Sequence, residues 1–193
     1  MKKICVFCGS SSGNDPIYEE YARNMAVAIR NNNQSLVYGG GSVGLMGIIA
    51  DELLRLGGEV IGVIPEFLAE LEVDHKGLTK MITVNSMHER KKEMSELSDA
   101  FIAMPGGFGT LEELAEILTW EQLGLIRKPI GLLNVNAYWD PFVRMLDQMV
   151  ETGFLKPENR KIIQIDSDPG SLLNSMQKFI PVITEKWLDK DQT

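Results

Sequence analysis

Ala103-Met104-Pro105-Gly106-Gly107-Phe108-Gly109-Thr110-Leu111-Glu112-Glu113 is the stretch of the sequence that decides the fold. An apolar, strand-like run at residues 100–104 leads into it, and a helical pattern over residues 111–125 leads out of it. The glycines between them let the backbone turn sharply and let a ligand approach without a Cβ in the way. The helix that follows directs its free N–H groups and the positive end of its dipole at this turn. Together, the strand, the turn and the helix start predict a phosphate-binding site.

Short apolar runs alternate with helical patterns along the rest of the chain, and the connections between them are short. Strands are expected at residues 3–8, 36–38, 60–64, 81–84, 100–104, 130–133 and 162–165. Helices are expected at about 16–31, 86–97, 111–125 and 138–152. Two more are expected, one from the glycines after residue 39 to about 56 and one from 168 onward, before a polar tail. Residues 66–79 are interpreted as a short helix and a loop. This alternation predicts one α/β domain over residues 1–193, with a doubly wound parallel sheet of about seven strands and helices on both faces.

Composition and charge restrict the class of protein. The 193 residues are 44% hydrophobic and 24% charged, which is typical of a globular domain, and the net charge is −8. An acidic chain is a poor non-specific ligand for nucleic acid or for an anionic membrane. The apolar run at the N-terminus ends at Cys8, which is too short for a secretory signal. We therefore expect a cytoplasmic protein without a nucleic-acid or membrane partner.

The two cysteines have the spacing CxxC but lie within a predicted strand. Cys5 and Cys8 are three residues apart, so their side chains should face opposite sides of the sheet. His75 and His88 are the only histidines, and a zinc site needs more ligands than this. We expect neither a disulfide nor a metal site.

Glycine- or serine-rich turns follow three of the predicted strands, at residues 9–13, 39–44 and 106–109. The carboxyl ends of parallel strands meet at one edge of a sheet, so the turns should lie together and form a nucleotide or sugar-phosphate pocket. Gly39-x-Gly41-x-x-Gly44 also fits a dinucleotide fingerprint, but Glu66 is the only candidate for the acidic residue that NAD binding requires. Phosphate or ribose contact, or a tight turn with close helix packing, explains these glycines better.

The candidates for chemistry are two charged side chains, Glu113 and Arg90. Thr110 and Glu113 have the spacing of a capping box. This capping role does not exclude a functional one: a helix N-terminus that keeps Glu113 ionised would suit it as a base or as a stabiliser of positive charge, and not as a general acid. Arg90 lies in the charged run 87–92, which is either a solvated helix face or, through its guanidinium, a site for phosphate and ribose oxygens.

The predicted helix at 111–125 is apolar on more than one face. Its apolar residues are Leu114, Ala115, Ile117, Leu118, Trp120, Leu123 and Leu125. Such a helix is either deeply buried or shared with a partner subunit. We expect a homodimer built partly on this helix, with a central core helix as the alternative.

The run from Pro105 to Glu113 resembles the PGGxGTxxE signature of the LONELY GUY (LOG) family, cytokinin riboside 5′-monophosphate phosphoribohydrolases that are often labelled lysine decarboxylases. Further similar segments follow in the family's order: Gly9-Ser10-Ser11, Gly39-Gly40-Gly41-Ser42, Met87-His88-Glu89-Arg90-Lys91 and Thr119-Trp120. The resemblance implies a Rossmann-like fold, usually as a dimer. It also implies hydrolysis of the N-glycosidic bond of AMP or N6-modified AMP to free base and ribose 5-phosphate, without a cofactor.

The same resemblance implies roles for individual residues. Arg90 and Glu113 would be the catalytic pair. The substrate-binding residues would be Ser10, Gly41, Ser42, Met87, Arg90, Lys91, Gly106, Gly107, Gly109 and Thr110, with the glycines of the signature and Thr110 at the phosphate. A non-catalytic nucleotide-sensing module is the alternative function, whereas a DNA-processing protein is disfavoured by the charge of −8.

Overall fold

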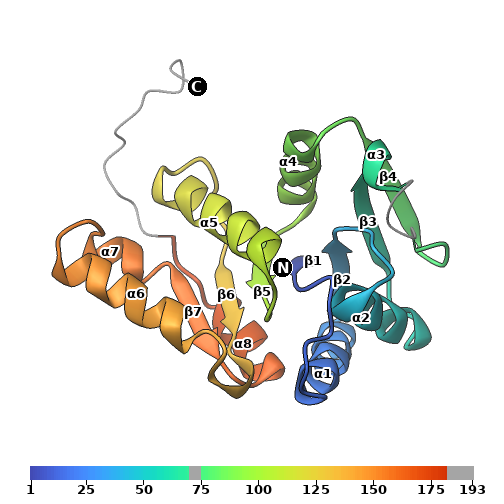
Figure 1. The fold of residues 1–193 in the computed structure, drawn as a ribbon, viewed down its shortest axis with the longest axis horizontal. Coiled ribbons are helices and arrows are strands. Elements are labelled where there is room, and N and C mark those ends of the chain that lie inside the picture. The colour runs from blue at the N-terminus through green and yellow to red at the C-terminus, as the bar shows by residue number, and fades with distance from the viewer. Residues whose placement is uncertain (70–74, 182–193) are drawn as a thin grey trace.

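The computed structural model describes residues 1–69 and 75–181, which form one α/β domain (Figure 1). Its seven strands are all parallel and follow the order β4-β3-β2-β1-β5-β6-β7. Their bounds are β1 Lys3–Phe7, β2 Ser35–Tyr38, β3 Val60–Pro65, β4 Lys80–Val84, β5 Ala100–Ala103, β6 Ile130–Leu133 and β7 Ile163–Asp166. All seven predicted strands are confirmed, within one or two residues at each end.

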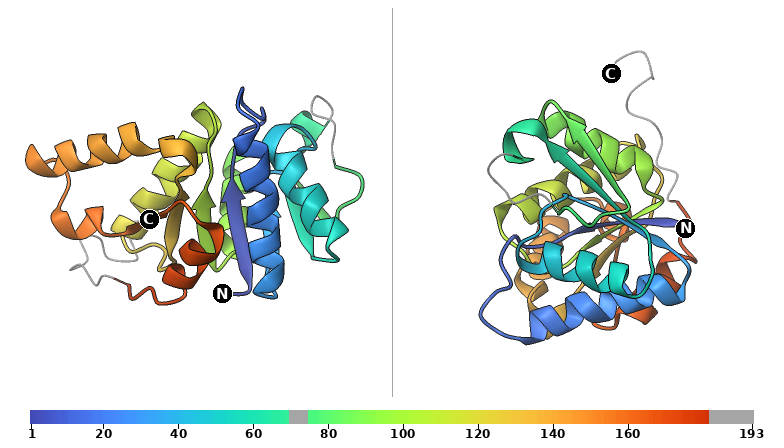
Figure 2. Two further views of the ribbon diagram at one scale, coloured as in Figure 1. Left: turned by 90° about the horizontal axis from the view of Figure 1, so that it is seen from below. Right: turned by 90° about the vertical axis from the view of Figure 1, so that its right-hand side faces the viewer.

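Helices cover both faces of the sheet (Figure 2). On one face lie α1 (Ile17–Asn31), α2 (Gly44–Arg55) and α8 (Pro169–Met176), which enclose one hydrophobic core. On the other face lie α4 (Met87–Leu97), α5 (Phe108–Gln122) and α6 (Asp140–Glu151), which enclose a second. The remaining short helices are α3 (Glu66–Ala69), α7 (Pro157–Arg160) and the 3-10 turn η1 (Val135–Ala137).

The central strands read as continuous apolar runs because they are buried on both faces. In β1, Ile4 packs into the core beneath α1, while its neighbour Cys5 packs into the core beneath α5. Cys8 lies in the same core as Ile4, so the prediction that the two cysteines face opposite sides is confirmed. Both cysteines are buried free thiols.

The helix starts follow local capping chemistry. The Ser86 hydroxyl accepts a hydrogen bond from the Glu89 N–H at 3.1 Å, which caps α4. The Asp168 carboxylate caps α8 in the same way, accepting from the Ser171 N–H at 2.7 Å. Two short helices were not predicted: α7 and η1. Part of the ambiguous stretch 66–79 and the polar tail after α8 lie outside the described residues.

The prediction for the start of α5 was wrong by three residues. Gly107 has an extended backbone (φ −92°, ψ −152°) and is the N-cap, and its carbonyl accepts from the Leu111 N–H at 3.1 Å. Thr110 is therefore already inside the first turn, and the capping-box interpretation of Thr110 and Glu113 is wrong. Glycine at the N-cap has no side chain to bind the first turn, which keeps its amide groups for other partners.

The order of the strands creates a switch point between β1 and β5. The chain runs outward from β1 to β4 and then returns to place β5 on the other side of β1. Sheets of this type bind ligands beyond the carboxyl ends of the strands at such a point. The three glycine turns meet there, because the Gly9 N–H donates to the Pro105 carbonyl and the Leu45 N–H to the Gly9 carbonyl, both at 3.0 Å. Their predicted position on one edge is confirmed.

Among residues 1–69 and 75–181, no helix has the length and apolar character needed to cross a membrane.

Candidate functional site

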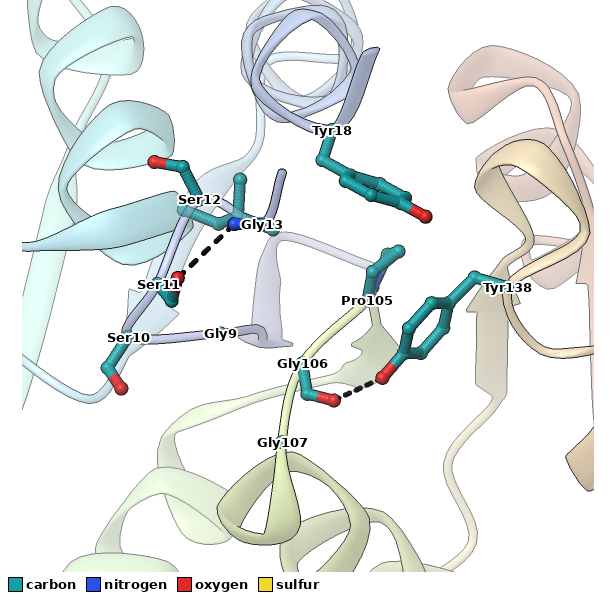
Figure 3. Close-up of a pocket in the computed structure, with 11 residues that line it drawn as sticks. Gly9, Ser10, Ser11, Ser12, Gly13, Tyr18, Pro105, Gly106, Gly107 and Tyr138 are labelled. Carbon is teal, nitrogen blue, oxygen red and sulfur yellow. Dashed lines mark hydrogen bonds between the residues drawn. The ribbon is translucent and has the colours of Figure 1, made fainter. Parts of the chain in front are cut away.

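A pocket of about 240 Å³ opens at the switch point (Figure 3). Its walls come from the loop after β1, the start of α1, the turn before α5 and the segment after β6. The lining residues are Gly9, Ser10, Ser11, Ser12, Gly13, Tyr18, Leu45, Pro105, Gly106, Gly107 and Tyr138. The pocket therefore contains two of the three glycine turns that the sequence singled out.

The glycines of the signature divide into two kinds. A Cβ on Gly106 would lie 2.1 Å from the Thr110 Oγ1 and 2.8 Å from the Gly9 nitrogen, so this glycine is required for packing. A Cβ on Gly107 or Gly109 would meet nothing within 4 Å. The space on the Cβ side of these two residues is open, and the first N–H groups of α5 have no acceptor within the helix, as an anion site requires.

The glycines after β2 allow close packing. Gly44 has a φ of +59°, and a Cβ there would lie 2.3 Å from the Ser10 carbonyl carbon. A Cβ on Gly39 would lie only 1.9 Å from the Arg90 Nη2. The close-packing interpretation of this motif is confirmed, and Gly39 in addition makes room for the guanidinium of Arg90.

Arg90 reaches this edge of the sheet from the first turn of α4. Its side chain is buried, and its Nη2 donates to the Gly39 carbonyl at 3.2 Å while its Nη1 contacts the Met87 Sδ at 3.7 Å. The buried Nε has no hydrogen-bond partner within the described part of the chain. The interpretation of the run 87–92 as a solvated face is therefore wrong for Arg90 and holds only for its exposed members, such as Glu89.

Glu113 lies in the second turn of α5, beside Arg90. Burial raises the pKa of Glu113 to about 7, the positive charge of Arg90 opposes this rise, and the negative charge of Glu112 adds to it. The expectation that the helix N-terminus would keep this group ionised is thus wrong at mildly acidic pH. The desolvation of an inward-facing carboxylate outweighs a helix dipole whose effect is confined to the first turn.

Lys91 connects α4 to α5 through ion pairs. Its buried ammonium binds the Glu112 carboxylate and lies 3.1 Å from Glu116 Oε1. These ion pairs hold together the two helices that carry Arg90 and Glu113.

The predicted site residues fall into three groups in the structure. Ser10, Gly106 and Gly107 line the pocket. Arg90 and Glu113 are close enough to influence each other's charge, and Thr110 is buried behind Gly106. Gly41, Ser42, Met87, Lys91 and Gly109 do not line the pocket itself.

Sequence reasoning missed two aromatic residues of the pocket, Tyr18 and Tyr138. Tyr18 lies at the start of α1, packs against the core beneath that helix and also faces the pocket (Figure 3). Tyr138 was predicted as the beginning of a helix, and no motif marks it. Its hydroxyl donates a hydrogen bond to the Gly106 carbonyl. Within the described residues, no group of three or more His, Cys, Asp or Glu side chains could hold a metal ion.

The strand order and the crevice at the switch point define a Rossmann-like α/β protein. Solved structures share this fold, and two of them illustrate the similarity. One is the molybdenum cofactor carrier protein from Chlamydomonas reinhardtii (TM-score 0.68, 20% identity, 91% of this chain and 96% of that one). The other is the molybdenum cofactor binding protein from Rippkaea orientalis (TM-score 0.68, 22% identity, 92% and 97%).

The sequence is much closer to a set of plant proteins. It is 46% identical over 94% of its length to cytokinin riboside 5′-monophosphate phosphoribohydrolase LOG2 of Arabidopsis thaliana, of which it covers 85%. It is 45% identical, again over 94% of its length, to the probable enzyme of the same name, LOGL2, of Oryza sativa subsp. japonica, of which it covers 74%. Residues 46–176 match the family model described as "Possible lysine decarboxylase". The chain belongs to the LONELY GUY (LOG) family.

Proposed function

We propose that this protein hydrolyses the N-glycosidic bond of AMP or of N6-modified, cytokinin-type riboside 5′-monophosphates, giving the free base and ribose 5-phosphate. The observation that carries the proposal is a largely desolvated carboxylate, Glu113, within the electrostatic influence of a buried guanidinium, Arg90, on the helix whose first amides lie at the switch point. The names of the plant relatives support the same reaction.

The proposed mechanism follows from the charge that develops on the sugar. Cleavage of the bond between base and ribose builds positive charge on the ribose, as in glycoside cleavage. The Glu113 carboxylate stabilises this charge and orients the attacking water. The amides at Gly107, Gly109 and Thr110 hold the phosphate at the start of α5, and this fixes the position of the anomeric carbon.

The other residues complete the proposed site. The unpartnered Nε of Arg90 leaves this side chain a donor for the phosphate or ribose oxygens. Ser10 lies in the pocket wall, and Met87 contacts the Arg90 guanidinium. Gly41 and Ser42 belong to the same turn as Gly39, whose carbonyl accepts a hydrogen bond from Arg90. The ammonium of Lys91 would reach the nucleotide only by sharing its charge with Glu112 and Glu116.

Incubation with AMP, followed by chromatography of the products, tests the reaction. We expect adenine and ribose 5-phosphate in equal amounts. AMP that binds without release of adenine would instead indicate a nucleotide-sensing module. A panel of nucleoside monophosphates in the same assay identifies the preferred base.

Lysine decarboxylation, which the description of the family model names, is a poor alternative. This chemistry usually needs a lysine that forms a Schiff base with pyridoxal phosphate. Burial lowers the pKa of Lys91, but its hydrogen bonds to Glu112 and Glu116 outweigh that effect and the pKa is raised. Lys91 is kept protonated in this way and is therefore a weak nucleophile, and Lys128, whose pKa is lowered by burial, does not line the pocket.

The pKa of Glu113 predicts the pH dependence of the reaction. The ionised carboxylate is the active form in this mechanism, and its pKa is about 7. Below pH 7, kcat/KM should therefore fall by about tenfold per pH unit, and above about pH 8 it should be level on the alkaline side of this group. A profile that is flat from about pH 5 to 8 would contradict the assignment of Glu113 as the ionised group.

Gly39→Ala should displace the guanidinium of Arg90. The added Cβ would lie 1.9 Å from the Arg90 Nη2, so the side chain must move. Because misplacement by about 1 Å can cost about a hundredfold in rate, we expect a loss of that order in kcat/KM. Gly170→Ala, where the nearest atom to an added Cβ is the Asp168 Oδ1 at 3.4 Å, is the control for the general effect of adding a methyl group. Wild-type activity in Gly39→Ala would show that the position of Arg90 does not matter.

We further propose that the protein is a homodimer that uses the outer face of α5. Phe108 is 94% exposed and Leu111 37% exposed, and Ala115 and Leu118 continue the same stripe at helical spacing.

Sedimentation velocity at micromolar concentration should give a dimer, and Ala115→Glu should shift it toward monomer because a charge enters an apolar contact without removing any packing. Val27→Glu on the exposed face of α1 is the matched control, and equal behaviour of the two variants would argue against α5 as the interface.

A further inference from the structure

The segment after β6 has an unfavourable backbone. Asn136 (φ 49°) and Ala137 (φ 57°) are successive non-glycine residues in the left-handed region. This conformation brings the Cβ close to the backbone, and it persists only where the surrounding structure holds it. Strain of this kind is concentrated at functional sites, so the residue that the turn presents, Tyr138, needs an explanation.

Two anchors hold the turn on either side. On one side, the Asn134 N–H donates to the Asp166 carbonyl of β7 at 2.9 Å, and its side chain accepts from the Trp139 N–H and donates to the Asp140 carboxylate, each at 2.8 Å. On the other side, the Trp139 ring is buried and packs edge-on against Tyr138 and Phe142. The direction of Tyr138 is therefore fixed by the fold and does not depend on a ligand.

The turn directs Tyr138 into the switch-point pocket (Figure 3). Its ring meets the Tyr18 ring edge-on, with the centroids 6.1 Å apart and the planes at 81°. Its hydroxyl donates a hydrogen bond to the carbonyl of Gly106. This contact joins the strained segment directly to the turn at the start of α5.

We propose that Tyr138 is a positioning residue for the phosphate: its hydroxyl fixes the Gly106–Gly107 peptide so that the Gly107 N–H is presented to the phosphate of the bound nucleotide. In a trans peptide the C=O and the N–H point in opposite directions. A Gly106 carbonyl held toward Tyr138 therefore turns the Gly107 N–H toward the opposite side, where Ser10 and Ser11 lie in Figure 3.

The peptide needs this restraint because it lies between two glycines. Glycine has the widest backbone freedom of all residues. Gly106 packs closely against Thr110 and Gly9, but a Cβ on Gly107 would meet nothing within 4 Å, so packing restrains this peptide on the Gly106 side only. A hydroxyl held by a rigid turn supplies the missing restraint before the ligand arrives, which reduces the ordering cost of binding. The inference rests on the proposed function only in taking a nucleoside monophosphate as the ligand.

The test compares two ligands that differ only in the phosphate. Tyr138→Phe removes the hydroxyl and keeps the ring, and combining it with Glu113→Gln prevents turnover, so that binding is measured by calorimetry. We expect the Kd for AMP to rise about tenfold, as for the loss of one oriented hydrogen bond to a charged group, and the Kd for adenosine to change by less than about twofold. Tyr21→Phe, which removes a hydroxyl from α1 outside this pocket, should change neither Kd.

Two results would overturn the inference: equal weakening of AMP and adenosine, or no change for AMP. Thermal unfolding of each variant checks the fold, and equal melting temperatures with a selective loss of AMP affinity support the positioning role. The measurement does not depend on catalysis. Release of no adenine by the wild-type protein would refute the proposed function, while a selective effect of Tyr138→Phe would still support the inference.

Discussion

Glu113→Gln is expected to stop base release while leaving the fold intact. The amide has the size of the carboxylate but carries no negative charge to stabilise the ribose and no basic oxygen to activate water. Loss of an acid–base group of this kind typically costs about 10²- to 10⁴-fold, so we expect kcat to fall by about 10³-fold. Adenine release from AMP at about pH 8, where the wild-type carboxylate is ionised, measures the effect.

The same variant should be more stable than the wild type at high pH. The pKa of Glu113 is about 7 in the folded protein, against an ordinary value of 4.5, so the folded state holds this proton more tightly than the unfolded state does. The protonated group therefore adds to the free energy of unfolding below pH 4.5, and this contribution is lost as the pH rises through about 7. The amide of the variant has no proton to lose. The difference in free energy of unfolding, variant minus wild type, should therefore be about 3 kcal/mol larger at about pH 8 than at about pH 4.

A matched control separates the role of Glu113 from a simple change of net charge. Glu96→Gln removes the same charge from the exposed face of α4, where Glu96 lies 3.9 Å from Lys92. This variant should keep wild-type activity and show little change in its pH–stability curve. If Glu113→Gln retained activity, or lost stability above about pH 7, the carboxylate would have a structural role only.

Arg90→Met is expected to have the second-largest effect. Methionine keeps much of the apolar volume but removes the charge that most strongly opposes the raised pKa of Glu113. We expect kcat/KM to fall by at least about a hundredfold at about pH 7, because the phosphate or ribose loses a charged donor and Glu113 becomes harder to ionise. Arg90→Lys should recover little activity, because a single ammonium cannot reproduce the fork of donors.

The pH profile distinguishes the two effects of removing Arg90. If the guanidinium only binds substrate, the apparent pKa of kcat/KM stays near the value of about 7 that Glu113 has in the wild type, while the activity falls. If it also keeps Glu113 ionisable, the profile moves to higher pH, which is the result we expect. A variant with the wild-type rate and profile would exclude Arg90 from both roles.

The sequence predicted the sheet well because its strands are short apolar runs buried on both faces, separated by turns with glycine. The placement of the two cysteines in opposite cores followed from strand periodicity alone. The positions of the three turns followed from the rule that parallel strands end at one edge. The strand positions, the sides of the two cysteines and the edge on which the turns lie all follow from short local patterns and a general rule for parallel sheets. They do not require knowledge of individual tertiary contacts.

The errors concern contacts and backbone geometry that the local pattern does not contain. Leu111 looked like the first helical residue, but the extended backbone of Gly107 starts α5 three residues earlier. The ionisation of Glu113 depends on burial against other elements and not on its place in its own helix. The sequence left open whether the run 87–92 is a solvated face, and only the assembled structure shows that the carbonyl of Gly39 and the acids of α5 bind Arg90 and Lys91.

Tyr138 shows most clearly why part of the site could not be predicted. Its place in the pocket depends on two successive left-handed residues, Asn136 and Ala137. Asparagine adopts this conformation more often than most residues, but alanine does not, so the residue types do not predict the turn. The turn is held by Asn134 through β7 and by buried Trp139, so only the assembled sheet reveals the contact with Gly106.

A crystal structure of Glu113→Gln with AMP tests the central claim most directly, because the variant should bind the nucleotide without cleaving it. We expect the phosphate on the amides at the start of α5, the ribose in the crevice between β1 and β5, and the anomeric carbon beside the side chain at position 113. AMP bound at another edge of the sheet, or a ribose turned away from that side chain, would contradict the account.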